Sequence, residues 1–266
     1  MSKNIFIACL ISSAVCVIST ETYAAVLEIS SGIYYFNYEE FSQSGTSLDS
    51  EKGYLPGIKI IFSQLHNGNK YSAHASVYSG TVDYSGGTQS GQPHTTKTEQ
   101  QLTQFGFEFI SKQIELIPVQ LNIGIKRWEW DRNILDRNNV QGLHEIYNWD
   151  EISIGLNFET KQYNNAFYWG NINALYTLSP VIEILLDTST AKLTMGEKPG
   201  FRLRAGKTWI LNNQNRYSLS IISEYWQFGR SNSVFIADFF GNPAFITEPD
   251  STSFHTRLEF SYTAYF

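Results

Sequence analysis

The stretch that decides the fold is the last thirteen residues of the chain, which read FHTRLEFSYTAYF (254–266). Alternate residues, beginning with Phe254 and ending with Phe266, form a mainly apolar face. The residues between them are mainly polar and include Arg257 and Glu259. A period of two is typical of a β-strand whose two faces meet different surroundings. The stretch therefore predicts a long strand between an apolar and a polar environment.

About ten segments of the chain show this alternation, and the linkers between them are alternately long and short. The predicted strands are residues 27–39, 54–65, 71–80, 102–110, 119–130, 147–159, 166–178, 201–211, 217–228 and 252–266. Membrane β-barrels have short turns on the periplasmic side and longer loops outside. We therefore expect an all-β fold, a closed antiparallel transmembrane barrel of ten strands, with eight or twelve as alternatives.

The composition agrees with a protein that has much of its surface outside water. Charged residues make up 17% of the 266 residues and aromatic residues 15%, whereas an ordinary soluble domain has about 25% charged residues. The formal net charge is −6. A nucleic-acid-binding protein would present a basic surface, so we expect no nucleic-acid partner.

Residues 1–24 have the features of a secretory signal peptide. Lys3 provides a positive start, an apolar run covers residues 5–17, and Thr22-Tyr23-Ala24 offers a cleavage site. The mature barrel domain would then be residues 25–266. Cys9 and Cys16 both lie in the removed segment, so no disulfide, cysteine–metal site or cysteine nucleophile is expected.

The C-terminal strand resembles the terminal strand of Gram-negative outer-membrane β-barrel proteins. In that group, terminal aromatic residues such as Phe260, Tyr262 and Phe266 resemble the signal read by the barrel-assembly machinery, although Ala264 departs from the usual larger residue. The resemblance implies export to the cell outer membrane, with outer-membrane lipid and lipopolysaccharide as surroundings. The size resembles that of ten-stranded members such as omptin proteases and Opc-type adhesins. We expect a monomer, because a closed barrel has no free edge.

The alternation also predicts a charged barrel interior. The polar faces contribute five basic and six acidic residues: Glu28, Lys59, Glu108, Lys126, Glu151, Glu159, Arg202, Arg204, Glu224, Arg257 and Glu259. Isolated buried charges are costly, so these groups either pair with one another and fill the lumen or line a path for a small solute. Barrels of about eight strands are filled by their own side chains, which favours the filled lumen.

The sequence contains no motif that indicates an enzyme. An omptin-like protease needs acidic pairs and an Asp–His pair at the outer rim, but the available residues do not form the paired-Asp motif of that family: Asp83, Asp131, Asp136, His144 and Asp150. No HExxH or GxSxG motif occurs, and the five histidines lack metal-ligand spacing. We expect no catalytic, cofactor or metal site, although a rim hydrolase of protease or lipid-hydrolase type is kept as an alternative.

Two predicted loops are of interest. The segment 234–246 is unusually apolar; it either folds back on the barrel mouth or forms a binding surface through Phe235, Phe239, Phe240 and Phe245. The segment 131–145 has mixed charge and is expected to be solvated. Arg127 and Asp150 are expected outside the barrel, where either they pair with each other or a bulge displaces them.

The expected function is a structural or adhesive surface protein with an occluded lumen, with a narrow pore as the alternative.

Overall fold

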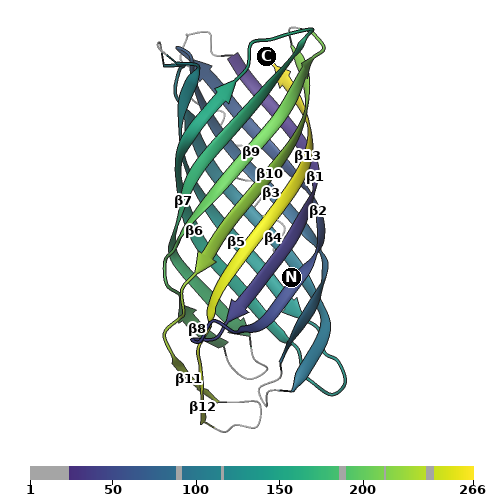
Figure 1. Cartoon of the computed structure of the whole chain (residues 1–266), viewed down its shortest axis with the longest axis vertical. Helices are drawn as coiled ribbons and strands as arrows, with labels where there is room; N and C mark the ends of the chain where they lie inside the picture. Colours follow the sequence, from purple (N-terminus) through teal and green to yellow (C-terminus); the bar gives the residue numbers. More distant parts are fainter. Residues whose placement is uncertain (1–23, 88–91, 115–116, 186–189, 213, 238–242) are drawn as a thin grey trace, which may run out of the picture.

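The structure, a computed structural model, describes residues 24–87, 92–114, 117–185, 190–212, 214–237 and 243–266. It is a tall, closed β-barrel (Figure 1). The barrel strands are β1 (Ala24–Phe41), β2 (Ser47–His66), β3 (Asn69–Gly87), β4 (Pro93–Ile110), β5 (Val119–Ile134), β6 (Leu143–Glu159), β7 (Ala166–Leu185), β9 (Pro199–Ile210), β10 (Asn215–Phe228) and β13 (Asp250–Tyr265). A short extra strand, β8 (Thr190–Thr194), pairs with the end of β7.

Each barrel strand pairs with the next one along the chain, and all the pairings are antiparallel. The ring closes where β1 pairs with β13, over a register that runs from Val26↔Tyr265 to Phe41↔Asp250. Closure leaves every barrel strand with two neighbours. The expected all-β barrel of ten strands is therefore confirmed.

The two faces of the wall differ as the alternation predicts. Outward side chains in the part of the barrel nearer the described chain ends are apolar and exposed; Phe107, for example, is 54% exposed and Ile154 56%. Their inward neighbours are buried and polar, such as Lys126 and Ser153. An exposed apolar band on a closed barrel is the surface that faces hydrocarbon in membrane barrels.

Two tight turns lie at one end of the barrel. Asn67 and Gly68 both have positive φ angles, 51° and 78°, as a two-residue type I′ hairpin turn requires. Asn164 and Asn165 form a second such turn, with φ angles of 47° and 56°. Both described chain ends lie at this end, because Ala24 pairs with Leu65 and the N–H of Phe266 donates to the carbonyl of Ala25. This is the arrangement of a periplasmic end.

At the opposite end the strands continue well beyond their predicted limits. Most have 16–20 residues, whereas a membrane crossing needs about 9–11. The segment 131–145 is not the solvated loop that we expected, since β5 continues to Ile134 and β6 begins at Leu143. The wall therefore extends past the apolar band on the extracellular side.

Arg127 and Asp150 mark the border between band and extension. Both face outward on neighbouring strands, and their side chains form an ion pair of 3.2 Å. A register shift lies beside them, between Asn148 and Asp150 in the pairing of β6 with β7. The structure thus contains both features that the sequence left as alternatives.

The hairpin of β11 (Val234–Ala237) and β12 (Pro243–Ile246) lies beyond the extracellular end, at the bottom of the view in Figure 1.

The predicted signal peptide falls almost entirely on residues 1–23, outside the described residues. No helix that is long and apolar enough to cross a membrane occurs in the described part of the chain.

Candidate functional site

The lumen at the level of the apolar band contains a connected set of ion pairs, here called the ion-pair layer. Arg202 bridges Glu151 at 2.6 Å and Glu224 at 2.5 Å. Arg257 continues the layer to Glu224 at 3.3 Å and to Glu259 at 3.8 Å. Two lysines complete it: Lys126 lies 3.4 Å from Glu151, and Lys59 pairs with Glu259. The layer joins six strands across the lumen, which are β2, β5, β6, β9, β10 and β13.

The remaining predicted lumen charges lie nearer the periplasmic end. Arg204 and Glu108 form a longer pair of 3.6 Å. Glu28 accepts a hydrogen bond from the hydroxyl of Ser30 at 3.3 Å. Glu159 is exposed at the last position of β6, so it does not take part in the ion-pair layer.

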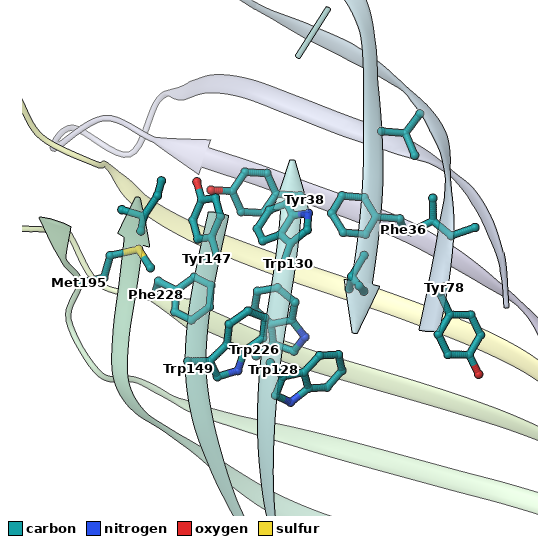
Figure 2. Packing of buried hydrophobic residues seen from close by; sticks show 14 of the residues in the cluster. Phe36, Tyr38, Tyr78, Trp128, Trp130, Tyr147, Trp149, Met195, Trp226 and Phe228 are labelled. Carbon is teal, nitrogen blue, oxygen red and sulfur yellow. The ribbon is translucent and has the colours of Figure 1, made fainter. Parts of the chain in front are cut away.

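On the extracellular side of the ion-pair layer, the lumen is filled by aromatic side chains, here called the aromatic layer (Figure 2). Trp130 stacks on Tyr147 with ring centroids 4.4 Å apart. Trp149 packs against Trp226 and Phe228, each at 5.1 Å. These side chains are at most 2% exposed. The rings of this layer are packed tightly against one another.

The extracellular end of the lumen contains the acidic cluster, which consists of Arg132, Glu40, Asp49, Glu51, Glu145 and Glu248. The Arg132 guanidinium lies 2.5 Å from Glu145, 3.0 Å from Glu51 and 3.2 Å from Glu40. Asp49 is 3.6 Å away. Arg132 is only 2% exposed. One buried cation therefore faces carboxylates from three different strands.

Glu248 joins the cluster from the connection that follows the β11–β12 hairpin. The hydroxyl of Tyr147 donates to its carboxyl at 2.7 Å, and the Glu248 backbone N–H donates to the hydroxyl of Ser231 at 2.8 Å. The segment between β10 and β13, here called the cap, is thus held to the barrel interior by a buried glutamic acid. Val234, Ile236 and Ile246 of the hairpin also pack against the aromatic layer.

Five carboxyl groups around one guanidinium do not all ionise easily in a buried site. Burial raises the pKa of Glu40 well above its usual range, and the carboxylates of Glu248 and Asp49 raise it further. Burial also raises the pKa of Asp49 and of Glu51, against the opposing charge of Arg132. For Glu248, burial and then the charge of Glu145 raise the pKa to about 8. The cluster therefore holds protons near neutral pH.

Neither the aromatic layer nor the acidic cluster was predicted from the sequence. Trp128, Trp130 and Arg132 alternate along β5 on the same face as Lys126, which was assigned to the lumen. Tyr147 and Trp149 likewise share a face with Glu151 on β6. Continuing the alternation past Lys126 and Glu151 would have found these residues.

The residues considered for a rim protease lie on the outer wall and pair locally. His144 Nε2 is 2.9 Å from Asp131, Asp83 pairs with Lys97, and Asp136 accepts from the backbone N–H of Gly142 at 2.5 Å. They do not converge on the acidic cluster. Within the described ranges, no group of three or more His, Cys, Asp or Glu side chains could hold a metal ion.

The hairpin has two different faces. Phe235 and Phe245 are directly opposite each other, with centroids 5.6 Å apart, and are 61% and 76% exposed. The hairpin thus folds onto the mouth with one face and presents an aromatic pair to the outside with the other. Phe239 and Phe240 lie outside the described residues. At the other end of the barrel, Phe260, Tyr262 and Phe266 are outward and exposed.

The fold is that of Gram-negative outer-membrane β-barrels. The outer membrane protease OmpT from Escherichia coli matches with a TM-score of 0.57 and 8% identity, over 93% of this chain and 99% of that one. The translocator domain of autotransporter NalP from Neisseria meningitidis has a TM-score of 0.48 and 9% identity, over 97% and 93% of the chains. OprG from Pseudomonas aeruginosa has a TM-score of 0.42 and 9% identity, over 91% and 96%. No family model and no curated protein matches the sequence.

Proposed function

We propose that this outer-membrane barrel is a non-conducting surface protein of structural or adhesive type. The observation that carries the proposal is the packing of the lumen. Every barrel strand contributes an inward side chain that is at most 2% exposed: Phe36, Leu55, Val82, Leu102, Trp130, Tyr147, Ile182, Arg202, Phe228 and Ser253. A water-filled channel would leave its lining residues accessible, as in wide porins. The packing favours the occluded lumen over a narrow pore.

Conductance in planar bilayers tests the closed lumen. We expect the purified full-length protein to give no steady ion-conducting steps, because the aromatic layer and the ion-pair layer lie in series across the lumen. A general porin inserted into the same bilayers provides the positive control. Heat-modifiable gel mobility shows that the inserted sample is folded. Reproducible open steps of uniform size would contradict the proposal and support the narrow pore.

The adhesive part of the proposal rests on the β11–β12 hairpin. The hairpin places two opposed, exposed phenylalanines at the outermost described part of the molecule. Contiguous exposed apolar side chains mark binding surfaces more often than single ones do. The inward face, including Ile236 and Ile246, fixes the hairpin to the mouth. Such an anchored aromatic pair suits contact with an apolar patch on another cell or on a host protein.

Replacing the aromatic pair tests this role. The variant Phe235→Ser/Phe245→Ser should fold normally and lose surface attachment of whole cells to abiotic and host-cell surfaces, by roughly fivefold if two hot-spot rings are removed. The matched control is Tyr163→Ser, which removes a 78%-exposed aromatic ring from the opposite end of the barrel. Attachment that is equal in the two variants would exclude the hairpin as the adhesive surface.

Export and assembly follow from the same proposal. Residues 1–24 would direct the chain to the periplasm and be cleaved, and the terminal residues Phe260, Tyr262 and Phe266 would be read by the barrel-assembly machinery. The outward position of these three side chains supports that role, since a docking surface must be accessible. Outer-membrane lipid and lipopolysaccharide would surround a monomeric barrel.

A further inference from the structure

The lipid-facing wall contains a hollow of about 830 Å³ that extends over β2 to β7. Two neighbouring rows of outward side chains form its sides. One row runs through paired residues from Gln64 on β2 to Ala174 on β7, and the other runs from Phe62 to Tyr176. The hollow is therefore a groove that crosses the strands, here called the wall groove.

The register gives the length of the wall groove. It crosses six strands, and adjacent strands are about 4.8 Å apart, so it is about 24 Å long. Half of a bilayer's hydrocarbon core is about 15 Å thick. A groove of this length, oblique to the membrane, can hold most of one extended acyl chain.

Small side chains make the groove deep at two points. Ala73 lies between Phe62 on β2 and Phe107 on β4, which are its direct cross-strand partners. Ala174 is paired with Ile154 at the other end. At these two points the floor of the groove lies below the side chains of its bulky neighbours.

The periplasmic end of the groove is polar. Gln64 and Tyr71 are paired at the periplasmic edge, directly beside the turn at Asn67 and Gly68. Lys112 is held beside that turn because its backbone N–H donates to the side chain of Asn69 at 2.8 Å. This lysine, exposed at the level of the lipid headgroups, provides charge complementarity for a phosphate.

We propose that the wall groove binds one acyl chain of a glycerophospholipid from the periplasmic leaflet, with the lipid phosphate at Lys112. The groove continues the membrane-facing band, so lipid is the medium that surrounds it. Its apolar length suits the chain, and its polar end lies where a periplasmic-leaflet headgroup would be. The lipid would bind at a defined place instead of exchanging freely with the surrounding bilayer.

Native mass spectrometry of the protein purified in mild detergent tests the groove. The variant Ala73→Trp fills it between Phe62 and Phe107, so retained phospholipid should fall by roughly fivefold or more as apolar contact is lost. The control is Ala75→Trp, which adds the same ring on the same face of β3, outside the groove lining. Gel mobility must show that both variants fold.

The control decides between a site and a general lipid annulus. The proposal is supported if Ala75→Trp retains as much lipid as the parent protein and Ala73→Trp does not. It is overturned if both variants retain equal amounts, or if the parent itself retains no phospholipid under conditions that keep the barrel folded.

The headgroup assignment is tested separately. Phosphatidylglycerol and phosphatidylcholine are added in turn, and Lys112→Gln should lower the retained phosphatidylglycerol about threefold relative to the parent. Lys97→Gln, an exposed lysine in the extracellular part of β4, is the control. Equal retention in Lys112→Gln and the parent would overturn the headgroup assignment. None of these results depends on whether the lumen conducts.

Discussion

Replacing Arg132 by methionine is expected to open the extracellular end of the barrel while leaving its membrane part folded. The guanidinium contacts Glu40, Glu51 and Glu145 within 3.2 Å and is almost completely buried. Removing one partner of a buried charged network leaves the others uncompensated, which typically costs about 3–5 kcal/mol. The loss should appear as faster hydrogen exchange in the extracellular halves of β1, β2, β5 and β6.

The control for this experiment is Arg137→Met. Arg137 is exposed, and its guanidinium donates to the backbone carbonyl of Thr95 at 2.9 Å, so its loss should change the exchange rates little. Lowering the pH should partly restore slow hydrogen exchange in Arg132→Met, because protonated carboxyl groups need no counter-charge. If these strands exchange their amide hydrogens equally fast in Arg132→Met and in Arg137→Met at neutral pH, then Arg132 does not hold the acidic cluster together.

The fold could be predicted from the sequence because one physical rule covers the membrane part of every strand. Hydrocarbon outside and a polar lumen inside impose the same alternation, so Ile123 and Ile125 on β5 face outward and Lys126 faces inward. Turn chemistry added the limits at the periplasmic end, where Asn67 and Gly68 have the positive φ angles that their residue types favour.

The same rule explains why the extracellular part was missed. Beyond Arg127 the outside is water, so the outward residues become polar, such as Glu129 and Asp131, while the inward ones become aromatic, such as Trp128 and Trp130. The alternation continues, but its apolar face changes from the outside to the inside. A reading that expects the apolar face to stay outside interprets this change as the end of the strand.

The partners within the lumen could not be derived from the sequence. Arg132 meets Glu40 and Glu51, which lie 92 and 81 residues away along the chain. Which side chains meet depends on barrel closure and on the stagger of all the strands between them. The sequence predicted that lumen charges exist, whereas only the structure separates the ion-pair layer from the acidic cluster and places Glu159 outside both.

The second large effect is expected from pH, through Glu248. Its pKa in the folded protein is about 8, raised by burial and then by the charge of Glu145, whereas an exposed glutamic acid titrates near pH 4.3. The folded protein therefore binds more protons than the unfolded chain between these values. The contribution of Glu248 to stability is complete below about pH 4.3 and is lost as the pH rises toward 8, at up to about 1.4 kcal/mol per pH unit.

The cap should accordingly be held most firmly in acid and loosen toward alkaline pH. Protection factors of the amides in β11 and β12 should fall between pH 5 and pH 8.5 in the parent protein. In Glu248→Gln, which keeps a hydrogen-bonding side chain beside Tyr147 but cannot ionise, this fall should become clearly smaller. Some pH dependence should remain, because burial also raises the pKa of Glu40, Asp49 and Glu51 in the same cluster.

A change in the exposed Glu183 provides the matched comparison. Its carboxylate pairs with Lys192 at 2.9 Å on the surface of the barrel, so Glu183→Gln should leave the pH profile of the cap as it is in the parent. If the cap of Glu248→Gln still loosens as much as that of Glu183→Gln, then the proton on Glu248 does not hold the cap. The hairpin would in that case be fixed to the mouth mainly by the apolar contacts of Val234, Ile236 and Ile246 with the aromatic layer, which do not depend on pH.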